Sequence, residues 1–221
     1  MSKLTLYDLP SKGRCSCWSL NPWKTRLALN FKNIDYKTEW TEYPDIASRL
    51  SPHFPTAPIS WNPKPSPSVS KKDHPTPPLH LDSPLLPKVQ ALLPKIMPPL
   101  SPVWQPAVPT NLLNPASKEF FERTRAERLG KPLAQIAQES GGEEAWMAAL
   151  PGIKELGALV KAEGGPFVMG KTPSYADFVI VGWLRFFKVI DEKLYERVVS
   201  IEPAFGTLYD ASKQWLERDD H

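Results

Sequence analysis

The sequence predicts an α+β fold in three parts: an α/β segment at residues 1–51, a proline-rich irregular segment at 52–109 and an all-helical segment at 110–221. Three observations support this prediction. The first segment has the order strand, helix, strand, and the third shows helical periodicity almost throughout. Between them, seventeen of the 26 prolines of the chain fall in a window that contains no glycine.

The composition of the 221-residue chain is typical of a globular protein, with 41% hydrophobic and 23% charged residues. The net charge of +3 is too small to indicate a nucleic-acid-binding protein. No apolar run is long enough to span a bilayer and no signal-peptide pattern is present, so we expect no membrane partner. Two cysteines exclude a disulfide framework, which favours a cytoplasmic location.

In the first segment, residues 4–7 have the composition of a short β-strand. A polar loop follows, and residues 22–32 are expected to form a helix with Asn21 as N-cap and Pro22 at the first helical position. An alternating pattern at residues 34–42 predicts a second strand. This order is that of a βαβ unit, in which the two strands are parallel and the crossover is right-handed.

The candidate site is the loop before this helix, because ligands of such units collect at the carboxyl ends of the strands. The N-terminus of the helix presents a positive dipole and free N–H groups there, which stabilise an anion. Ser19 is the hydroxyl residue at that position. Cys15 and Cys17 also lie in the loop, but their C-x-C spacing is not that of a dithiol redox motif, so we expect packing residues.

Histidine and metal chemistry are not expected. Three of the four histidines (His53, His74 and His80) lie in the proline-rich window, and the fourth is His221. No group of cysteines and histidines has the spacing of metal ligands. Catalysis by a hydroxyl at a helix N-terminus needs neither a histidine nor a metal.

The sequence LTLYDLP, followed by Trp18-Ser19 and WKTRLALNFKNIDYKTEWTEYPDIA, resembles the thioredoxin-like half of fungal glutathione S-transferases. It is most similar to the basidiomycete serine-type class and to its omega-like and β-etherase relatives. In this resemblance Ser19 falls on the catalytic serine, and glutathione is the implied co-substrate. Ser19, Asn21 and Trp23 would bind glutathione, and Trp18 would contact the second substrate. The chain departs from the family at Leu20, where relatives have proline.

The third segment contains the most specific local pattern of the chain. Ser174 and Asp177 stand in the S-x-x-D register of a capping box before a strongly apolar run. The surrounding sequence, PFVMGKTPSYADFVIVGWL, resembles the all-helical C-terminal domain of glutathione transferases, where such a box starts the buried central helix. We therefore expect a structural role for both residues.

The proline-rich window interrupts this resemblance. Glutathione transferases of this type need a further β-β-helix unit, entered through a cis-proline, and nothing in residues 52–109 matches it. No stretch there longer than eight residues is free of proline, which disfavours a central strand or a long helix. The window is either a genuine insertion or a stretch translated in a wrong frame or across a mis-assigned splice junction. The abrupt return of family-like sequence near residue 111 favours the second explanation.

The resemblance implies that a glutathione thiolate, stabilised by Ser19, attacks an electrophilic or aromatic ether small molecule. Such transferases are usually dimers, but the altered middle segment lies where the dimer contact would form, which argues against a homodimer. Two alternatives stay open. One is a catalytically inactive relative that binds ligands, and the other is a thiol transferase that uses Cys15 or Cys17.

Overall fold

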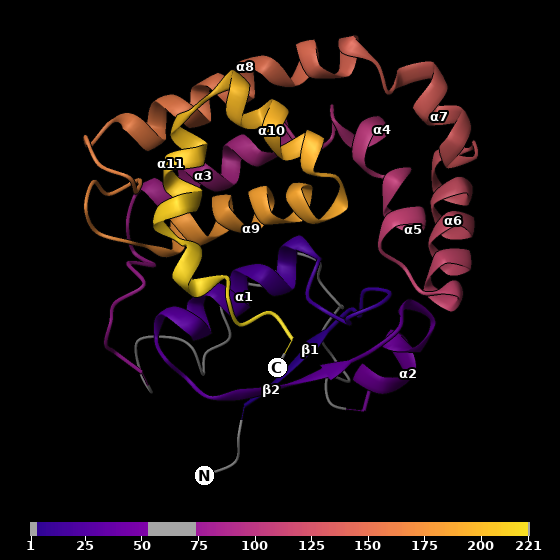
Figure 1. The fold of residues 1–221 in the computed structure, drawn as a ribbon, viewed down its shortest axis with the longest axis horizontal. Coiled ribbons are helices and arrows are strands. Elements are labelled where there is room, and N and C mark those ends of the chain that lie inside the picture. The colour runs from indigo at the N-terminus through magenta and orange to yellow at the C-terminus, as the bar shows by residue number, and fades with distance from the viewer. Residues whose placement is uncertain (1–3, 53–73, 221) are drawn as a thin grey trace.

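A small parallel sheet lies at one end of a helical body. The computed structural model describes residues 4–52 and 74–220. Strands β1 (Leu4–Asp8) and β2 (Tyr36–Trp40) are parallel neighbours, with Leu4 opposite Tyr36 in the register. Helix α1 (Leu20–Phe31) connects them. The predicted βαβ unit is confirmed, and Figure 1 shows α1 between this sheet and helix α9 (Tyr175–Ile190).

Helix α1 begins earlier than predicted. Its N-cap is Ser19, with φ −76° and ψ 136°, and not Asn21. Pro22 therefore occupies the third helical position instead of the first. The first four N–H groups of a helix have no intrahelical acceptor, so a proline anywhere in that turn costs no hydrogen bond.

The expectation of an irregular segment up to residue 109 is wrong from residue 85 onward. After a short helical stretch (η1, Tyr43–Asp45, and α2, Ile46–Leu50), the described chain resumes at residue 74. Short helices follow: α3 (Leu85–Leu92), η3 (Leu93–Lys95), α4 (Ser101–Trp104) and α5 (Ala107–Asn111). Each has a proline at its second or third residue, where the ring is tolerated. Of the remainder of the predicted irregular segment, residues 74–84 contain no helix or strand, and residues 53–73 lie outside the described residues.

The window also contains a cis-proline, which the sequence alone did not identify. The peptide bond between Thr76 and Pro77 is cis. No strand follows it within residues 74–220. The acid–serine pair Asp82-Ser83 precedes α3, where the Ser83 hydroxyl accepts a hydrogen bond from the N–H of Leu85 at 3.3 Å.

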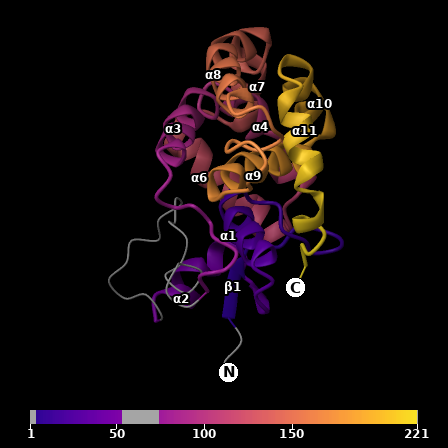
Figure 2. The same ribbon diagram turned by 90° about the vertical axis from the view of Figure 1, so that its left-hand side faces the viewer.

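The all-helical part is confirmed. It contains α6 (Pro115–Leu129), α7 (Leu133–Ser140), α8 (Glu143–Lys161), α9, α10 (Glu192–Ile201), α11 (Ala204–Ala211) and the short η4 (Lys213–Trp215). In Figures 1 and 2, α8 runs across the end opposite the sheet, α10 and α11 cover one side, and α9 lies in the centre. No helix among the residues described is long and apolar enough to cross a membrane.

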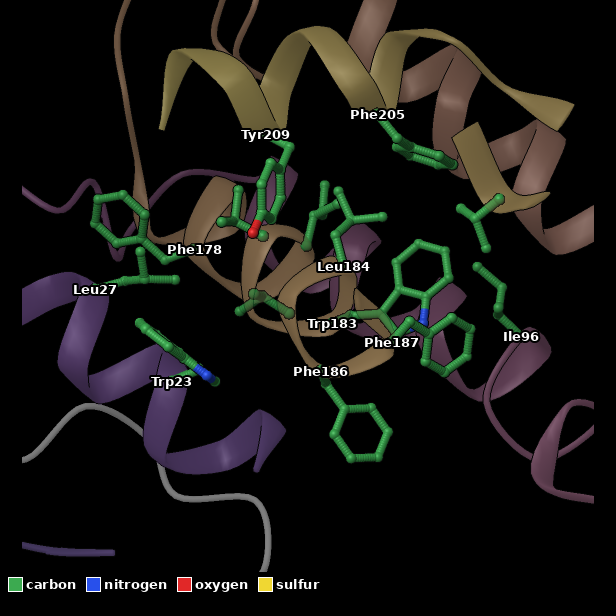
Figure 3. Packing of buried hydrophobic residues seen from close by; sticks show 14 of the residues in the cluster. Trp23, Leu27, Ile96, Phe178, Trp183, Leu184, Phe186, Phe187, Phe205 and Tyr209 are labelled. Atoms are coloured by element: carbon green, nitrogen blue, oxygen red, sulfur yellow. The ribbon is translucent and has the colours of Figure 1, made fainter. Parts of the chain in front are cut away.

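The buried core centres on α9. Figure 3 shows Trp183, Phe187 and Phe205 gathered on one side of this helix, with Trp23 and Leu27 of α1 on the other. Helix α1 approaches α9 closely at Gly182, where an added Cβ would lie 3.5 Å from the Trp23 Cβ atom. An alanine there would make ordinary van der Waals contact with α1, and a side chain longer than Cβ would push the two helices apart.

The predicted capping box starts α9. Ser174 is the N-cap, and it and Asp177 make the reciprocal bonds of the box. One carboxylate oxygen of Asp177 accepts from the N–H of Ser174 at 2.8 Å, and the other accepts from the N–H of Val168 at 2.7 Å. Both residues are fully buried. The carboxylate therefore joins the helix start to the preceding loop.

Candidate functional site

Ser19 lies where the loop after β1 turns into α1. Its carbonyl accepts from the N–H of Trp23 at 3.2 Å, which closes the first helical turn. Its hydroxyl caps no backbone group of the helix. The side chain is 8% exposed. The hydroxyl is thus held at the positive end of α1, where an anion is stabilised.

The loop that carries Ser19 is fixed by Asp219. The N–H of Cys17 donates to the carbonyl of Asp219 at 2.8 Å. The carboxylate of Asp219 pairs with Arg14 at 2.5 Å and with Arg185 of α9 at 3.2 Å. From the helix side, the indole Nε1 of Trp23 donates to the Cys17 carbonyl at 3.1 Å. The loop just before Ser19 is therefore fixed by Asp219 on one side and by Trp23 of α1 on the other.

A buried ion pair lies below the loop. Nη2 of Arg26 on α1 is 2.8 Å from a carboxylate oxygen of Asp8 at the end of β1, and neither side chain is exposed. The same nitrogen donates to the Thr38 hydroxyl at 3.0 Å, and Nη1 donates to the Tyr36 hydroxyl at 3.3 Å. The pair therefore ties α1 to both strands.

Cys17 is beside this pair and is fully buried. Burial raises the pKa of the Cys17 thiol well above its ordinary value, and the nearby Asp8 carboxylate raises it further. Cys15 is half-buried, and burial raises the pKa of its thiol too. Neither cysteine has the lowered pKa of a reactive thiolate.

The two tryptophans predicted to contact ligands both face the interior. Trp18 is 2% exposed, and its ring stacks on Phe186 of α9 and lies near Tyr43, with centroid distances of 6.2 and 6.3 Å. Trp23 is completely buried between α1 and α9, beneath the Arg185 guanidinium. No surface of the Trp23 side chain is exposed for the predicted contact with glutathione. The apolar stripe of α1 explains it, since Trp23 shares that stripe with Leu27.

A pocket of about 320 Å³ opens next to the N-terminal turn of α1. It lies between α1, the α3–η3 segment and the start of α9, and Asn21 is one of its lining residues. Lys24 lines it as well, although that side chain is 5% exposed. Burial lowers the pKa of the Lys24 ammonium to about 8. The pocket thus brings a predicted ligand-binding residue, Asn21, next to a buried cation.

Sequence reasoning missed Lys24. The stripe of Trp23, Leu27 and Phe31 identifies one apolar face of the helix and leaves Lys24 on another face. The helix is covered on more than one side, so Lys24 and Arg26 are buried with the stripe. The sequence did contain a signal for this burial. Lys24 and Arg26 lie within a short helix that connects two strands, and such a helix has little exposed surface for two cations. No cluster of potential metal ligands occurs in residues 4–52 or 74–220.

Comparisons with known proteins agree with this fold. A sequence model of the glutathione S-transferase C-terminal domain matches residues 89–214, more than half of the chain. The match begins at residue 89, so family-like sequence resumes earlier than residue 111. A glutathione S-transferase-like protein of Aspergillus flavus is 32% identical over an alignment of 255 residues, which covers 98% of this chain and 92% of the relative.

Two solved structures extend the likeness to the whole fold. A glutathione S-transferase of Ceriporiopsis subvermispora, in complex with glutathione, is 28% identical with a TM-score of 0.79, and the match covers 97% of this chain and 98% of that one. A glutathione transferase of Phanerochaete chrysosporium is 25% identical with a TM-score of 0.81, and the match covers 100% of both chains.

Proposed function

Since the chain belongs to the glutathione S-transferase family, we propose that it conjugates glutathione to an electrophilic or aromatic ether small molecule, with Ser19 as the catalytic residue. The observation that carries the proposal is the place of Ser19 at the N-terminus of α1, with a hydroxyl that caps no group of the helix. The glutathione bound in the Ceriporiopsis relative supports the choice of co-substrate.

The chemistry needs a stabilised thiolate. The Ser19 hydroxyl donates a hydrogen bond to the glutathione sulfur, and the helix N-terminus adds positive potential, so the thiol loses its proton to solvent near neutral pH. The thiolate then forms a carbon–sulfur bond with the electrophile. The bond between that carbon and the leaving group breaks, and the leaving group departs with the electron pair. In an ether substrate the bond that breaks is the carbon–oxygen bond, and the departing oxygen takes up a proton from solvent.

The other predicted residues act in different ways. Asn21 lines the pocket beside Ser19. In this proposal it contacts the glutathione peptide. Trp23 acts as a positioning residue, because its indole holds the Cys17 carbonyl and so shapes the loop before Ser19. Trp18 stacks on Phe186 of α9 and so anchors the loop before Ser19 to that helix. In this proposal the enzyme works in the cytoplasm as the sequence predicts.

The test compares Ser19→Ala with Ser16→Ala, a serine of the same loop. The measurement is kcat/KM for conjugation of glutathione to a chlorodinitrobenzene probe across the pH range. Loss of one positioned donor to an anion lowers turnover by about 10²–10³-fold. We expect that loss for Ser19→Ala, with the pH profile moved upward by the higher thiol pKa. A Ser19→Ala enzyme as active as Ser16→Ala would refute the role of Ser19.

A ligand-binding protein without turnover is the second candidate. The largely apolar lining of the pocket beside α1 favours it, because such a lining holds small molecules without any reaction. Under this candidate, the wild-type chain binds ligands but shows no conjugation above the uncatalysed rate. The thiol transferase alternative is disfavoured by the raised pKa values of Cys15 and Cys17.

A further inference from the structure

The backbone of Cys17, two residues before Ser19, is held at both of its polar groups. Its N–H donates to the carbonyl of Asp219 at 2.8 Å, and its carbonyl accepts from the indole Nε1 of Trp23 at 3.1 Å. The backbone N–H of Trp23 donates in turn to the carbonyl of Ser19 at 3.2 Å. The path of the loop into α1 is therefore set by one residue of that helix and by one residue that follows η4.

Arg185 of α9 connects these two anchors. Its Nη2 is 3.2 Å from a carboxylate oxygen of Asp219. Its guanidinium lies over the indole ring of Trp23, 5.4 Å from the ring centroid, where a cation is attracted to the face of the ring. The contacts thus close into a ring, which we call the Asp219 ring and which consists of Cys17, Trp23, Arg185 and Asp219.

The carboxylate of Asp219 joins the loop to the central helix of the core. The residue is 4% exposed, and a carboxylate so far from water is stable only beside cations or other donors. One of its oxygens pairs with Arg14 of the loop at 2.5 Å, and the other pairs with Arg185 of α9. Removing this charge would therefore loosen the loop from α9 on the side opposite Trp23.

The segment that carries Asp219 has further anchors of its own. The guanidinium of Arg218 pairs with Asp35 at 3.0 Å, and the carbonyl of Arg218 accepts from the side-chain amide of Asn30 at 3.1 Å. The same amide of Asn30 donates to the carbonyl of Trp215 at 2.7 Å. Loss of the Asp219 carboxylate therefore weakens the Asp219 ring and leaves these contacts in place.

We propose that Asp219 is a positioning residue for catalysis, which acts through the Asp219 ring to hold the Ser19 hydroxyl within hydrogen-bond reach of the glutathione sulfur. This inference rests on the proposed function, because that function assigns the hydrogen bond to Ser19. The Ser19 hydroxyl caps no group of the helix, so its place depends on the backbone that the ring holds. A misplacement of about 1 Å at a reacting centre costs up to about 10²-fold in rate.

The test uses Asp219→Asn, with Asp220→Asn as the matched control. Asp220 is the next residue and also pairs with Arg14, at 3.0 Å, but its side chain is 40% exposed and lies outside the ring. Two quantities are measured across the pH range: kcat/KM with the chlorodinitrobenzene probe, and the ultraviolet absorbance of the thiolate of bound glutathione. Circular dichroism and Tm report separately on folding.

We expect Asp219→Asn to raise the pKa of the bound glutathione thiol by about one unit, which lowers kcat/KM about tenfold at pH values below that pKa. Asp220→Asn should keep the wild-type pH profile. The double variant Ser19→Ala with Asp219→Asn should be no slower than Ser19→Ala alone, because a residue that acts through Ser19 has no effect once the hydroxyl is gone. A purely structural role would lower Tm and leave the thiol pKa unchanged.

Three results would overturn the inference: a wild-type thiol pKa in Asp219→Asn, an equal shift in Asp220→Asn, or losses that multiply in the double variant. If Asp219→Asn does not fold, Arg185→Met opens the same ring while Asp219 keeps Arg14, and it is judged by the same criteria. An inactive wild type or a fully active Ser19→Ala rejects the proposed function together with this inference. A wild type that depends on Ser19, beside an unaffected Asp219→Asn, rejects this inference alone.

Discussion

The capping box of α9 gives the sharpest stability prediction. In Asp177→Ala, the N–H groups of Val168 and Ser174 lose the carboxylate oxygens that accept from them at 2.7 and 2.8 Å. The Ser174 hydroxyl, which donates to the same carboxylate at 2.7 Å, loses its acceptor as well. All these groups lie at a buried helix start, so water cannot replace the lost acceptors.

The expected cost follows from the number of orphaned donors. Each buried N–H left without an acceptor costs about 1–3 kcal/mol, and the hydroxyl rotates to a new partner at little cost. Two backbone donors therefore cost about 4 kcal/mol. Burial raises the pKa of Asp177, which means that the charged carboxylate is destabilised by the loss of water around it. Removing the carboxylate removes this unfavourable desolvation and so offsets part of the loss in stability. We expect a net loss of about 3 kcal/mol, or about 6–12 °C in Tm for a chain of this size.

Thermal unfolding, followed by circular dichroism at 222 nm, measures the effect. Asp191→Ala is the matched control, because Asp191 caps α10 at an exposed position, where its carboxylate accepts from the N–H of Lys193 at 3.0 Å. Loss of such a cap costs about 1 kcal/mol. Asp177→Asn keeps one acceptor and should fall between the two alanine variants. Equal losses for Asp177→Ala and Asp191→Ala would show that the buried donors find other partners, and the reasoning would be wrong.

Three further predictions follow from the site. Lys24→Met should stabilise the protein by up to about 3 kcal/mol at pH 7, because the folded amine has a pKa of about 8 against 10.5 when exposed. The gain in the free energy of unfolding should shrink to under about 1 kcal/mol at pH 10, where the amine of the unfolded chain also begins to lose its proton. Urea titrations at pH 7 and pH 10 measure this gain, and equal gains at the two pH values would contradict the prediction. Arg26→Met leaves the Asp8 carboxylate buried and unpaired, and should cost about 3–5 kcal/mol in the same assay, with partial recovery on adding Asp8→Asn. A thiol reagent should modify half-buried Cys15 before fully buried Cys17 in the folded protein, as read by mass spectrometry, and equal rates would revive the thiol transferase alternative.

Local patterns in the sequence predict their own structures well. The capping box of Ser174 and Asp177 needs only four consecutive residues, and the structure contains it as predicted. The βαβ order is likewise predicted by the spacing of hydrophobic residues, which alternate in the strands and recur every three to four residues in the helix. The start of α1 was misplaced because Pro22 suits every position of a first helical turn, so it fixes the turn but not the N-cap.

Features that depend on tertiary contacts were not predictable. The stripe that contains Trp23 marks the face of α1 against α9, but the pocket that Lys24 lines is shared with α3 and η3, which lie in a window that looked irregular. Those helices are short, and each tolerates proline because the ring falls in the first turn. Composition alone could not separate such helices from an extended segment.

The bond between Cys17 and Asp219 has a consequence for how the protein is made. The loop before Ser19 is closed by a contact that spans about 200 residues of sequence, and bringing such distant residues together carries an entropic cost that grows with the length of chain between them. The first strand and helix leave the ribosome early in synthesis. The N–H of Cys17 in the loop between them has its acceptor, the carbonyl of Asp219, only when residue 219 has been added. The hydrogen bond that closes this early loop therefore cannot form until nearly the whole chain has been synthesised.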